Sequence, residues 1–309
     1  MRTTVKRRES GFTVVELLAV VGIIALLIGL LIPALATVRR VAKETKQKAQ
    51  LTTIELALVA FKNDYGDYPP SDWMPGVPGP SQDYCGAQKL SEALLGWDLL
   101  GFHPRSAWRA DGLDENGAEF TYDPAKLRAD ASLYERKGPY LELGTASAYR
   151  LGDVSAVEPG LFPLPLFGTV PLAPNTFVLC DVFGWRKIVQ LDGKIVKAGA
   201  PILYYRANTA AKNINSIYDI RDNDGIVELK YQVDGRGQPL GGGPYPPPFS
   251  NQIEYFYGTA DPFDGITGYI QDPKVTTRPW PYKPDSYILI SAGMDGIYGT
   301  GDDITNFGN

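Results

Sequence analysis

The chain has 309 residues and a net charge of −5, from 30 lysines and arginines against 35 aspartates and glutamates. Nucleic-acid binding depends on a basic surface, so this balance argues against a nucleic-acid partner. The 33 glycines and 25 prolines indicate many turns, in a chain long enough for one large or two modest domains. The two cysteines, Cys85 and Cys180, leave open whether a disulfide joins them, because one widely spaced pair does not report geometry.

A basic leader, residues 1–11, precedes a long apolar segment. From Phe12 to Val38 the only charged residue is Glu16, and the segment exceeds the roughly 20 apolar residues that cross a bilayer as a helix. Basic residues outnumber acidic ones in the leader, which favours its retention on the cytoplasmic side. We therefore expect a single transmembrane helix over residues 12–38, with the remainder of the chain on the far side of the membrane.

The acid within this segment, Glu16, predicts more than an anchor. An ionised side chain inside a bilayer costs about 2.5–3.5 kcal/mol on insertion scales and is normally paired. If a peptidase cuts between Gly11 and Phe12, the new α-amine of Phe12 lies one helical turn before Glu16. In a stack of identical helices, the amine of one copy can pair with Glu16 of its neighbour.

Two other interpretations of the apolar segment are open. Ala34-Leu35-Ala36 fits the cleavage pattern of an ordinary secretory signal, although the segment is far longer than the usual 7–15 residues of such a signal. Alternatively, the helix is a plain single-span anchor in which Glu16 reaches towards the membrane interface.

Residues 11–17, Gly-Phe-Thr-Val-Val-Glu-Leu, follow the basic leader and resemble the class III signal of type IV pilins and type II secretion pseudopilins. Pro33 stands where these families often carry a helix-loosening proline. The resemblance implies that prepilin peptidase removes the leader after Gly11 and that Phe12 becomes N-methylated. It implies a homo-oligomeric filament assembled through Phe12, Glu16 and Pro33. It further implies a single-pass protein of the inner membrane, with a periplasmic head and with membrane lipid and other secretion or pilus subunits as partners.

A second helical pattern continues beyond the apolar segment. Apolar residues recur there at spacings of three and four, as on one face of a helix. These residues are Leu51, Ile54, Leu58 and Phe61. Gly66 suits the position after a helix C-terminus. The sequence therefore predicts a long helix over residues 12–66, whose second half packs on a globular head, residues 67–309.

The first part of the head, residues 71–175, is predicted to be an insertion-like elaboration with little regular structure. One short amphipathic helix is expected around Leu90–Trp97. A second is expected from Asp123, as the N-cap before a proline, to about Arg136. The chain's one histidine, His103, is expected to be a surface or loop residue.

The second part of the head, residues 176–309, is predicted to be β-rich and to end in an acidic loop. Short β-branched and aromatic runs are bounded there by Gly, Asp and Pro, and an Asp-Gly pair predicts a hairpin turn at 192–193. The predicted strands are 177–180, 187–190, 202–206 and 286–291. The fold class is therefore α+β and pilin-like, with the long N-terminal helix packed on an antiparallel β-sheet head enlarged by loop and helix insertions.

The acidic loop near the C-terminus is a candidate metal site. Three carboxylates lie on a glycine-rich segment after a strand, and carboxylates together with backbone carbonyls suit Ca²⁺. The spacing fails the EF-hand pattern but resembles the C-terminal calcium loop of G-type pseudopilins. By that resemblance Asp295, Asp302 and Asp303 are side-chain ligands, and Ala292 and Ile297 are carbonyl donors. The alternative is that these acids only solubilise and cap a turn.

A second acidic cluster, Asp219, Asp222 and Asp224, is predicted to be a solvated turn, because Ile220 stands where an EF-hand has its first ligand. No Gly-x-Ser-x-Gly, His-Glu-x-x-His or phosphate-binding glycine loop is present, so no enzyme activity is predicted. We therefore expect a structural subunit that is similar to the G-type (major) pseudopilin of a type II secretion system. The alternatives are an adhesive or DNA-uptake type IV pilin, and a membrane-anchored exported enzyme or binding module.

Overall fold

The computed structural model describes most of the chain and confirms the α+β class. The described residues are 13–73, 83–117, 120–122, 135–153, 160–168, 170, 172–189, 193–233, 253–258 and 268–308. The chain forms two compact units, Met1–Thr45 and Lys46–Asn309, and the long helix α1 (Val14–Tyr65) contributes to both.

The other elements are short. The helices are α2 (Gly86–Leu95), η1 (Leu164–Gly168), α5 (Ile214–Ile217), η2 (Ile220–Asn223), α6 (Asp224–Tyr231) and α7 (Ile253–Tyr257). The strands are β1 (Ala148–Arg150), β2 (Phe177–Leu179), β3 (Arg186–Val189), β4 (Ile195–Ala198), β5 (Leu203–Arg206), β6 (Tyr287–Ser291) and β7 (Ile304–Thr305).

In the first unit, α1 exposes apolar side chains on all sides. Each side chain that the structure describes between Thr13 and Lys43 is exposed, and α1 is long and apolar enough to cross a membrane. None of its most apolar window is buried, which distinguishes it from the core helix of a soluble protein. A helix that is hydrophobic all round requires an apolar surrounding, such as lipid or other helices.

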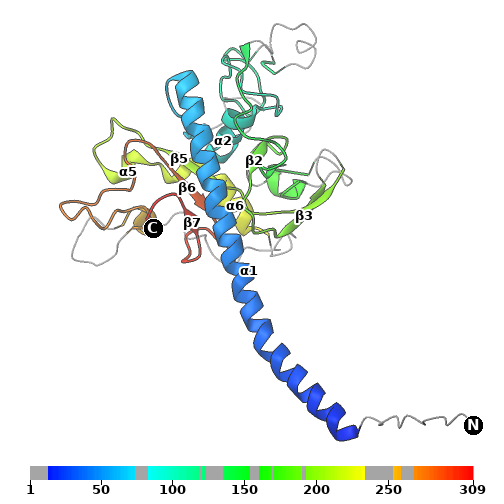
Figure 1. Cartoon of the computed structure of the whole chain (residues 1–309). Coiled ribbons are helices and arrows are strands. Elements are labelled where there is room, and N and C mark those ends of the chain that lie inside the picture. The colour runs from blue at the N-terminus through cyan, green and yellow to red at the C-terminus, as the bar shows by residue number, and fades with distance from the viewer. Residues whose placement is uncertain are drawn as a thin grey trace, which may run out of the picture. The chain divides into compact units, whose positions relative to one another are not determined.

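In the second unit, α1 packs by one face only. Its buried apolar residues are Leu51, Ile54, Ala57, Leu58 and Phe61, in agreement with the predicted stripe. They contact α2 and one face of the sheet β5–β6–β7, and Figure 1 shows this sheet beside the C-terminal half of α1. The helix ends at Tyr65, where Gly66 adopts a φ of 88° and its amide donates to the carbonyl of Lys62 at 2.7 Å. A left-handed glycine is a common helix terminator, so the predicted stop is confirmed.

The antiparallel sheet β5–β6–β7 is covered on both faces. Strand β6 lies between β5 and β7, with Tyr204 opposite Leu289 and Ser291 opposite Ile304. Side chains alternate along a strand, so Tyr204 and Leu289 contribute to the cluster that contains α1. Leu203 and its neighbours on the opposite face contribute to a second, larger cluster with α6 and α7. This explains why β6 is an uninterrupted run of buried residues.

Helix α2 lies inside the head, and each of its ten residues is buried. Asn223 accepts from the amide of Ala87 at 2.8 Å and donates to the carbonyl of Tyr204 at 2.7 Å, which joins the start of α2 to β5. The helix ends at Leu95, two residues before the predicted end. Trp97 lies beyond it, because Gly96 leaves the helical conformation.

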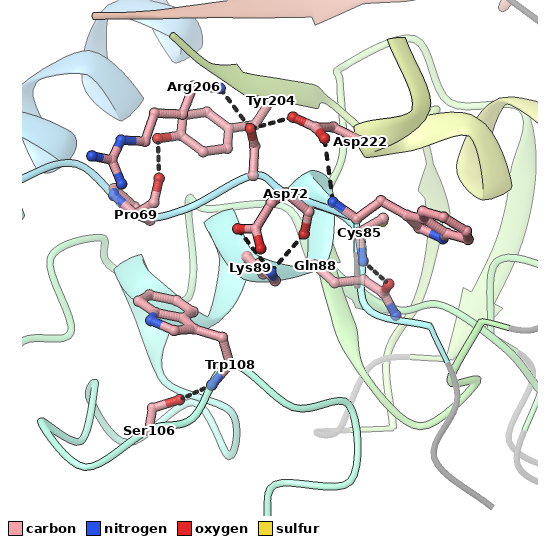
Figure 2. Close-up of polar contacts among 12 residues, drawn as sticks. Pro69, Asp72, Cys85, Gln88, Lys89, Ser106, Trp108, Tyr204, Arg206 and Asp222 are labelled. Atoms are coloured by element: carbon pink, nitrogen blue, oxygen red, sulfur yellow. Dashed lines mark hydrogen bonds and ion pairs between the residues drawn. The ribbon is translucent and has the colours of Figure 1, made fainter. Parts of the chain in front are cut away.

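The segment that follows α1 is held against α2 and β5 by polar contacts (Figure 2). The hydroxyl of Tyr204 donates to the carbonyl of Pro69 at 2.7 Å. The ammonium of Lys89 donates to the carbonyl of Asp72 at 2.7 Å, and the hydroxyl of Ser71 donates to Asp222 at 2.5 Å. Hydrogen bonds therefore join the segment after α1 to α2, β5 and η2, in addition to apolar packing.

Other strand predictions are confirmed with shifted ends. Observed β2, β3, β5 and β6 begin or end within one residue of their predicted ranges. Val189 pairs with Ile195, as expected for a hairpin, although the turn residues 190–192 lie outside the described part of the chain. The predicted helix from Asp123 to Arg136 also falls largely on residues outside it. Strands β1, β4 and β7 lie outside the predicted strand ranges.

His103 was predicted to be a surface or loop residue, and it lies in a loop but is buried, with 4% exposure. Its ring nitrogen Nδ1 accepts from the amide of Arg105 at 3.1 Å. The prediction for the second acidic cluster is wrong. The cluster at Asp219, Asp222 and Asp224 is not a solvated turn but the start of η2 and α6. Asp222 is 5% exposed, since Ser71 and the amide of Trp73 donate to its carboxyl.

The open question about the cysteines is answered by their placement. The thiols of Cys85 and Cys180 are both free and both buried. Burial raises the pKa of Cys85 to about 12, so this thiol is protonated at neutral pH and is a poor nucleophile.

The buried carboxyl of Asp222 predicts a pH-dependent stability. Burial raises its pKa from 3.8 to about 7, against the opposing effect of the hydrogen bonds from Ser71 and Trp73. Between these two values the folded chain retains a proton that the unfolded chain has lost. The free energy of unfolding should therefore fall as the pH rises from about 4 to 7, by roughly 1.4 kcal/mol per pH unit from this group alone.

We expect Asp222→Asn to remove this part of the slope when urea unfolding of the full chain is measured from pH 4 to 7. Asp111→Asn is the matched control, because the hydrogen bonds from Arg109 lower the pKa of Asp111 and keep its titration below this range. An unchanged slope in Asp222→Asn would show that the Asp222 carboxyl is already ionised in the folded chain.

Candidate functional site

The start of α1 is a reciprocal capping arrangement between Thr13 and Glu16. The amide and the hydroxyl of Thr13 donate to Oε2 of Glu16, at 2.9 and 2.8 Å. The amide of Glu16 donates to the Thr13 hydroxyl at 3.3 Å. This is the capping box of a helix N-terminus, in which two otherwise unpaired backbone amides are satisfied by side chains.

Sequence reasoning missed this role, although Thr-x-x-Glu before an apolar run is its recognised signature. The predicted cleavage site between Gly11 and Phe12 lies outside the described residues. Pro33 lies within α1, which continues past it. Within the described chain, Glu16 forms no ion pair with a lysine, arginine or histidine. Its charge is therefore not neutralised by the part of its own chain that is described.

The predicted calcium ligands lie on one loop. Ser291 of β6 pairs with Ile304 of β7, so residues 292–303 form the connection between two adjacent antiparallel strands. We call residues 292–303 the acidic loop. It carries Asp295, Asp302 and Asp303, with Ala292 at its start.

The carboxylate of Asp302 organises the acidic loop internally. Its Oδ2 accepts from the amides of Met294 and Asp295 at 2.7 and 3.0 Å, and its Oδ1 accepts from the hydroxyl of Thr300 at 2.6 Å. Burial acts against ionisation, but these hydrogen bonds outweigh it and lower the pKa of Asp302. Gly293 allows the close approach, since a Cβ there would lie 2.2 Å from the carbonyl oxygen of Asp302.

Asp303 faces the protein interior. Its Oδ2 accepts from the hydroxyl of Tyr269 at 2.6 Å and from the amide of Gly299 at 2.7 Å. Its Oδ1 is buried and has no hydrogen-bond partner among the described residues. Burial raises the pKa of Asp303 to about 7, and the neighbouring charges of Asp302 and Asp295 act in the same direction. A bound cation would favour the ionised form of this carboxyl and supply a partner for its free oxygen.

Asp295 is exposed at the surface of the acidic loop. Its Oδ1 accepts from the amide of Ile297 at 2.8 Å, and partial burial raises its pKa. The oxygen donors of the loop fit calcium in kind. Among the described residues, however, no three His, Cys, Asp or Glu side chains are grouped as a metal site. Calcium binding therefore stays a prediction, in which backbone carbonyls such as those of Ala292 and Ile297 supply part of the donor set.

Comparison with known proteins gives one informative match. The chain is 34% identical over 67 residues to the type II secretion system core protein G of Aeromonas hydrophila. The resemblance to G-type pseudopilins is confirmed. The match covers 22% of this chain and 47% of the relative, so the chain spans about half the length of the curated relative that it matches. No protein-family model and no solved structure matches the chain.

Proposed function

We propose that the chain is a structural subunit of a type II secretion pseudopilus, or of a related type IV pilus-like filament, and that it assembles through α1. The observation that carries this proposal is the similarity to a core protein of the type II secretion system, in a chain whose first helix is apolar and exposed. An exposed apolar surface of this extent requires lipid or neighbouring helices to cover it. Before assembly the cover is the inner membrane, and in the filament it is the α1 helices of other copies.

Processing and orientation follow from the same proposal. Prepilin peptidase cuts between Gly11 and Phe12, the new amine is methylated, and the head, residues 67–309, lies in the periplasm. The positive leader supports this orientation, because basic residues flanking a span are retained in the cytoplasm. In the filament, Glu16 of one copy neutralises the amine of Phe12 in an adjacent copy.

Calcium is the second part of the proposal. The acidic loop supplies oxygen donors only, and Asp303 has a buried oxygen without a partner among the described residues. Calcium bound there would join β6 to β7 at the edge of the sheet on which α1 packs. The ion would serve the stability of the head.

The processing proposal is tested by mass spectrometry of the protein isolated from cells that contain the relevant peptidase. We expect a chain that starts at N-methylated Phe12, because the signal at residues 11–17 directs cleavage after Gly11. A chain that starts at Thr37, or an intact leader, would contradict the filament proposal.

The assembly proposal is tested with two substitutions at Glu16. Glutamine at this position retains the capping box with Thr13 but removes the charge, whereas alanine removes both. If charge pairing between copies drives assembly, Glu16→Gln and Glu16→Ala both insert into the membrane and both fail to form filaments, as scored by shearing and electron microscopy.

Glu44→Gln is the control, because it removes a carboxylate from the same helix and breaks only an exposed ion pair with Arg40. This variant should assemble normally. Normal filaments from Glu16→Gln, with none from Glu16→Ala, would show that Glu16 acts as a helix cap rather than as a charge.

The calcium proposal predicts that a chelator lowers the melting temperature of the full chain and that added calcium restores it. Asp295→Asn should weaken this response, because it removes the negative charge of an exposed ligand and leaves the packing of the core unchanged. Asp272→Asn, in a turn outside the acidic loop, should respond as the parent does. A melting temperature indifferent to calcium in the parent chain would reject the site.

A further inference from the structure

Lys230 is a nearly buried cation for which no role has been assigned. It lies near the end of α6 and is 9% exposed. An ammonium is costly to bury unless it is paired. The other buried lysine in the described chain, Lys89, meets this requirement, since its ammonium lies 2.7 Å from the carbonyl and 3.3 Å from the carboxylate of Asp72. Lys230 forms no hydrogen bond and no ion pair among the described residues.

The head of the Lys230 side chain lies against the acidic loop. A Cβ built on Gly296 would be 3.2 Å from the ammonium nitrogen of Lys230 and 3.5 Å from its Cε. Gly296 is the residue between Asp295 and Ile297, two of the predicted calcium ligands. The ammonium also lies 4.6 Å from the centre of the Trp185 ring, which provides a cation–π contact. A positive charge is thus placed at the backbone of a loop that carries three carboxylates.

The acids near Lys230 are consistent with an electrostatic role. Burial lowers the pKa of Lys230, and the charges of Asp181 and Asp295 oppose this effect. Asp181 is buried and accepts from the amide of Phe183 at 2.9 Å and from the hydroxyl of Ser291 at 3.2 Å. Ser291 is the last residue before the acidic loop. Burial raises the pKa of Asp181 to about 7, so this carboxyl carries only part of a negative charge at neutral pH. Asp295 is the acid of the loop itself whose charge acts on Lys230.

We propose that Lys230 is the built-in counter-ion of the acidic loop and that it competes electrostatically with a divalent cation for the loop's negative charge. This inference rests on the proposed calcium binding. The ammonium offsets part of the loop's negative charge when no metal is bound, and it repels a metal ion that enters. Lys230 would in this way set the calcium affinity without being a ligand, and replacing it by a neutral residue should raise the affinity on the order of tenfold.

The test compares four full-length proteins in detergent micelles after removal of metal with a chelator. They are the parent, Lys230→Met, Lys230→Arg and Lys187→Met. Methionine is similar in length to lysine but uncharged, and arginine keeps the charge. Lys187→Met is the matched control, because it removes one charge from an exposed position on β3. Calorimetric titration with calcium chloride gives the dissociation constant, and melting temperatures with and without calcium give a second readout.

We expect Lys230→Met to bind calcium about tenfold more tightly than the parent and to gain more in melting temperature on calcium addition. Lys230→Arg and Lys187→Met should match the parent. If Lys230→Met proves unfolded by circular dichroism, Lys230→Gln provides a second neutral variant with the same expectation.

The other outcomes show which of the two proposals, the calcium site or the role of Lys230, fails. If the parent binds calcium and the neutral variant binds it equally or more weakly, calcium binding stands and the role of Lys230 is rejected. If only the neutral variant binds calcium, Lys230 is confirmed as the competing charge, and the proposal that the parent chain binds calcium is rejected. If neither binds, both proposals are rejected.

Discussion

One helix has to satisfy two different surroundings, and the organisation of the chain depends on this constraint. Over its first half α1 is apolar on all sides and exposed, whereas over its second half one apolar stripe is buried against the head. The change occurs without a break in the helix. An all-round apolar surface can be covered only by lipid or by other helices, while a single stripe is covered by the chain's own head. Under the proposed function, anchoring, assembly and folding of the head are combined in this one element.

The buried face of α1 determines how the head is built. Leu58 and Phe61 contact α2 and one face of the sheet, and the opposite face of the same sheet is covered by the cluster that contains α6 and α7. Strand β6 is consequently central and buried on both sides. The acidic loop leaves from the end of this central strand. A cation that orders the loop would therefore act on the sheet that supports α1.

The two charged features of the chain illustrate different solutions to the cost of a charge in an apolar setting. Glu16 accepts hydrogen bonds from Thr13, which satisfy the helix start but leave its charge without a described counter-ion. Lys230 lies against the Trp185 ring and Gly296, and the nearby acids Asp181 and Asp295 oppose the lowering of its pKa by burial. We infer that the charge of Glu16 is neutralised by another copy of the chain. We also infer that the charge of Lys230 sets the calcium affinity of the acidic loop.

Periodicity and turn chemistry are local properties, and they were enough to predict the long helix, its end at Gly66 and four of the strands. They also placed the three carboxylates on one loop after a strand. The burial of His103 and Asp222 could not be predicted in this way, since their partners Tyr122 and Ser71 are distant in sequence. The same holds for Lys230, whose neighbours Trp185 and Gly296 lie far from it along the chain. Burial and charge pairing depend on contacts between distant segments, and no local pattern encodes them.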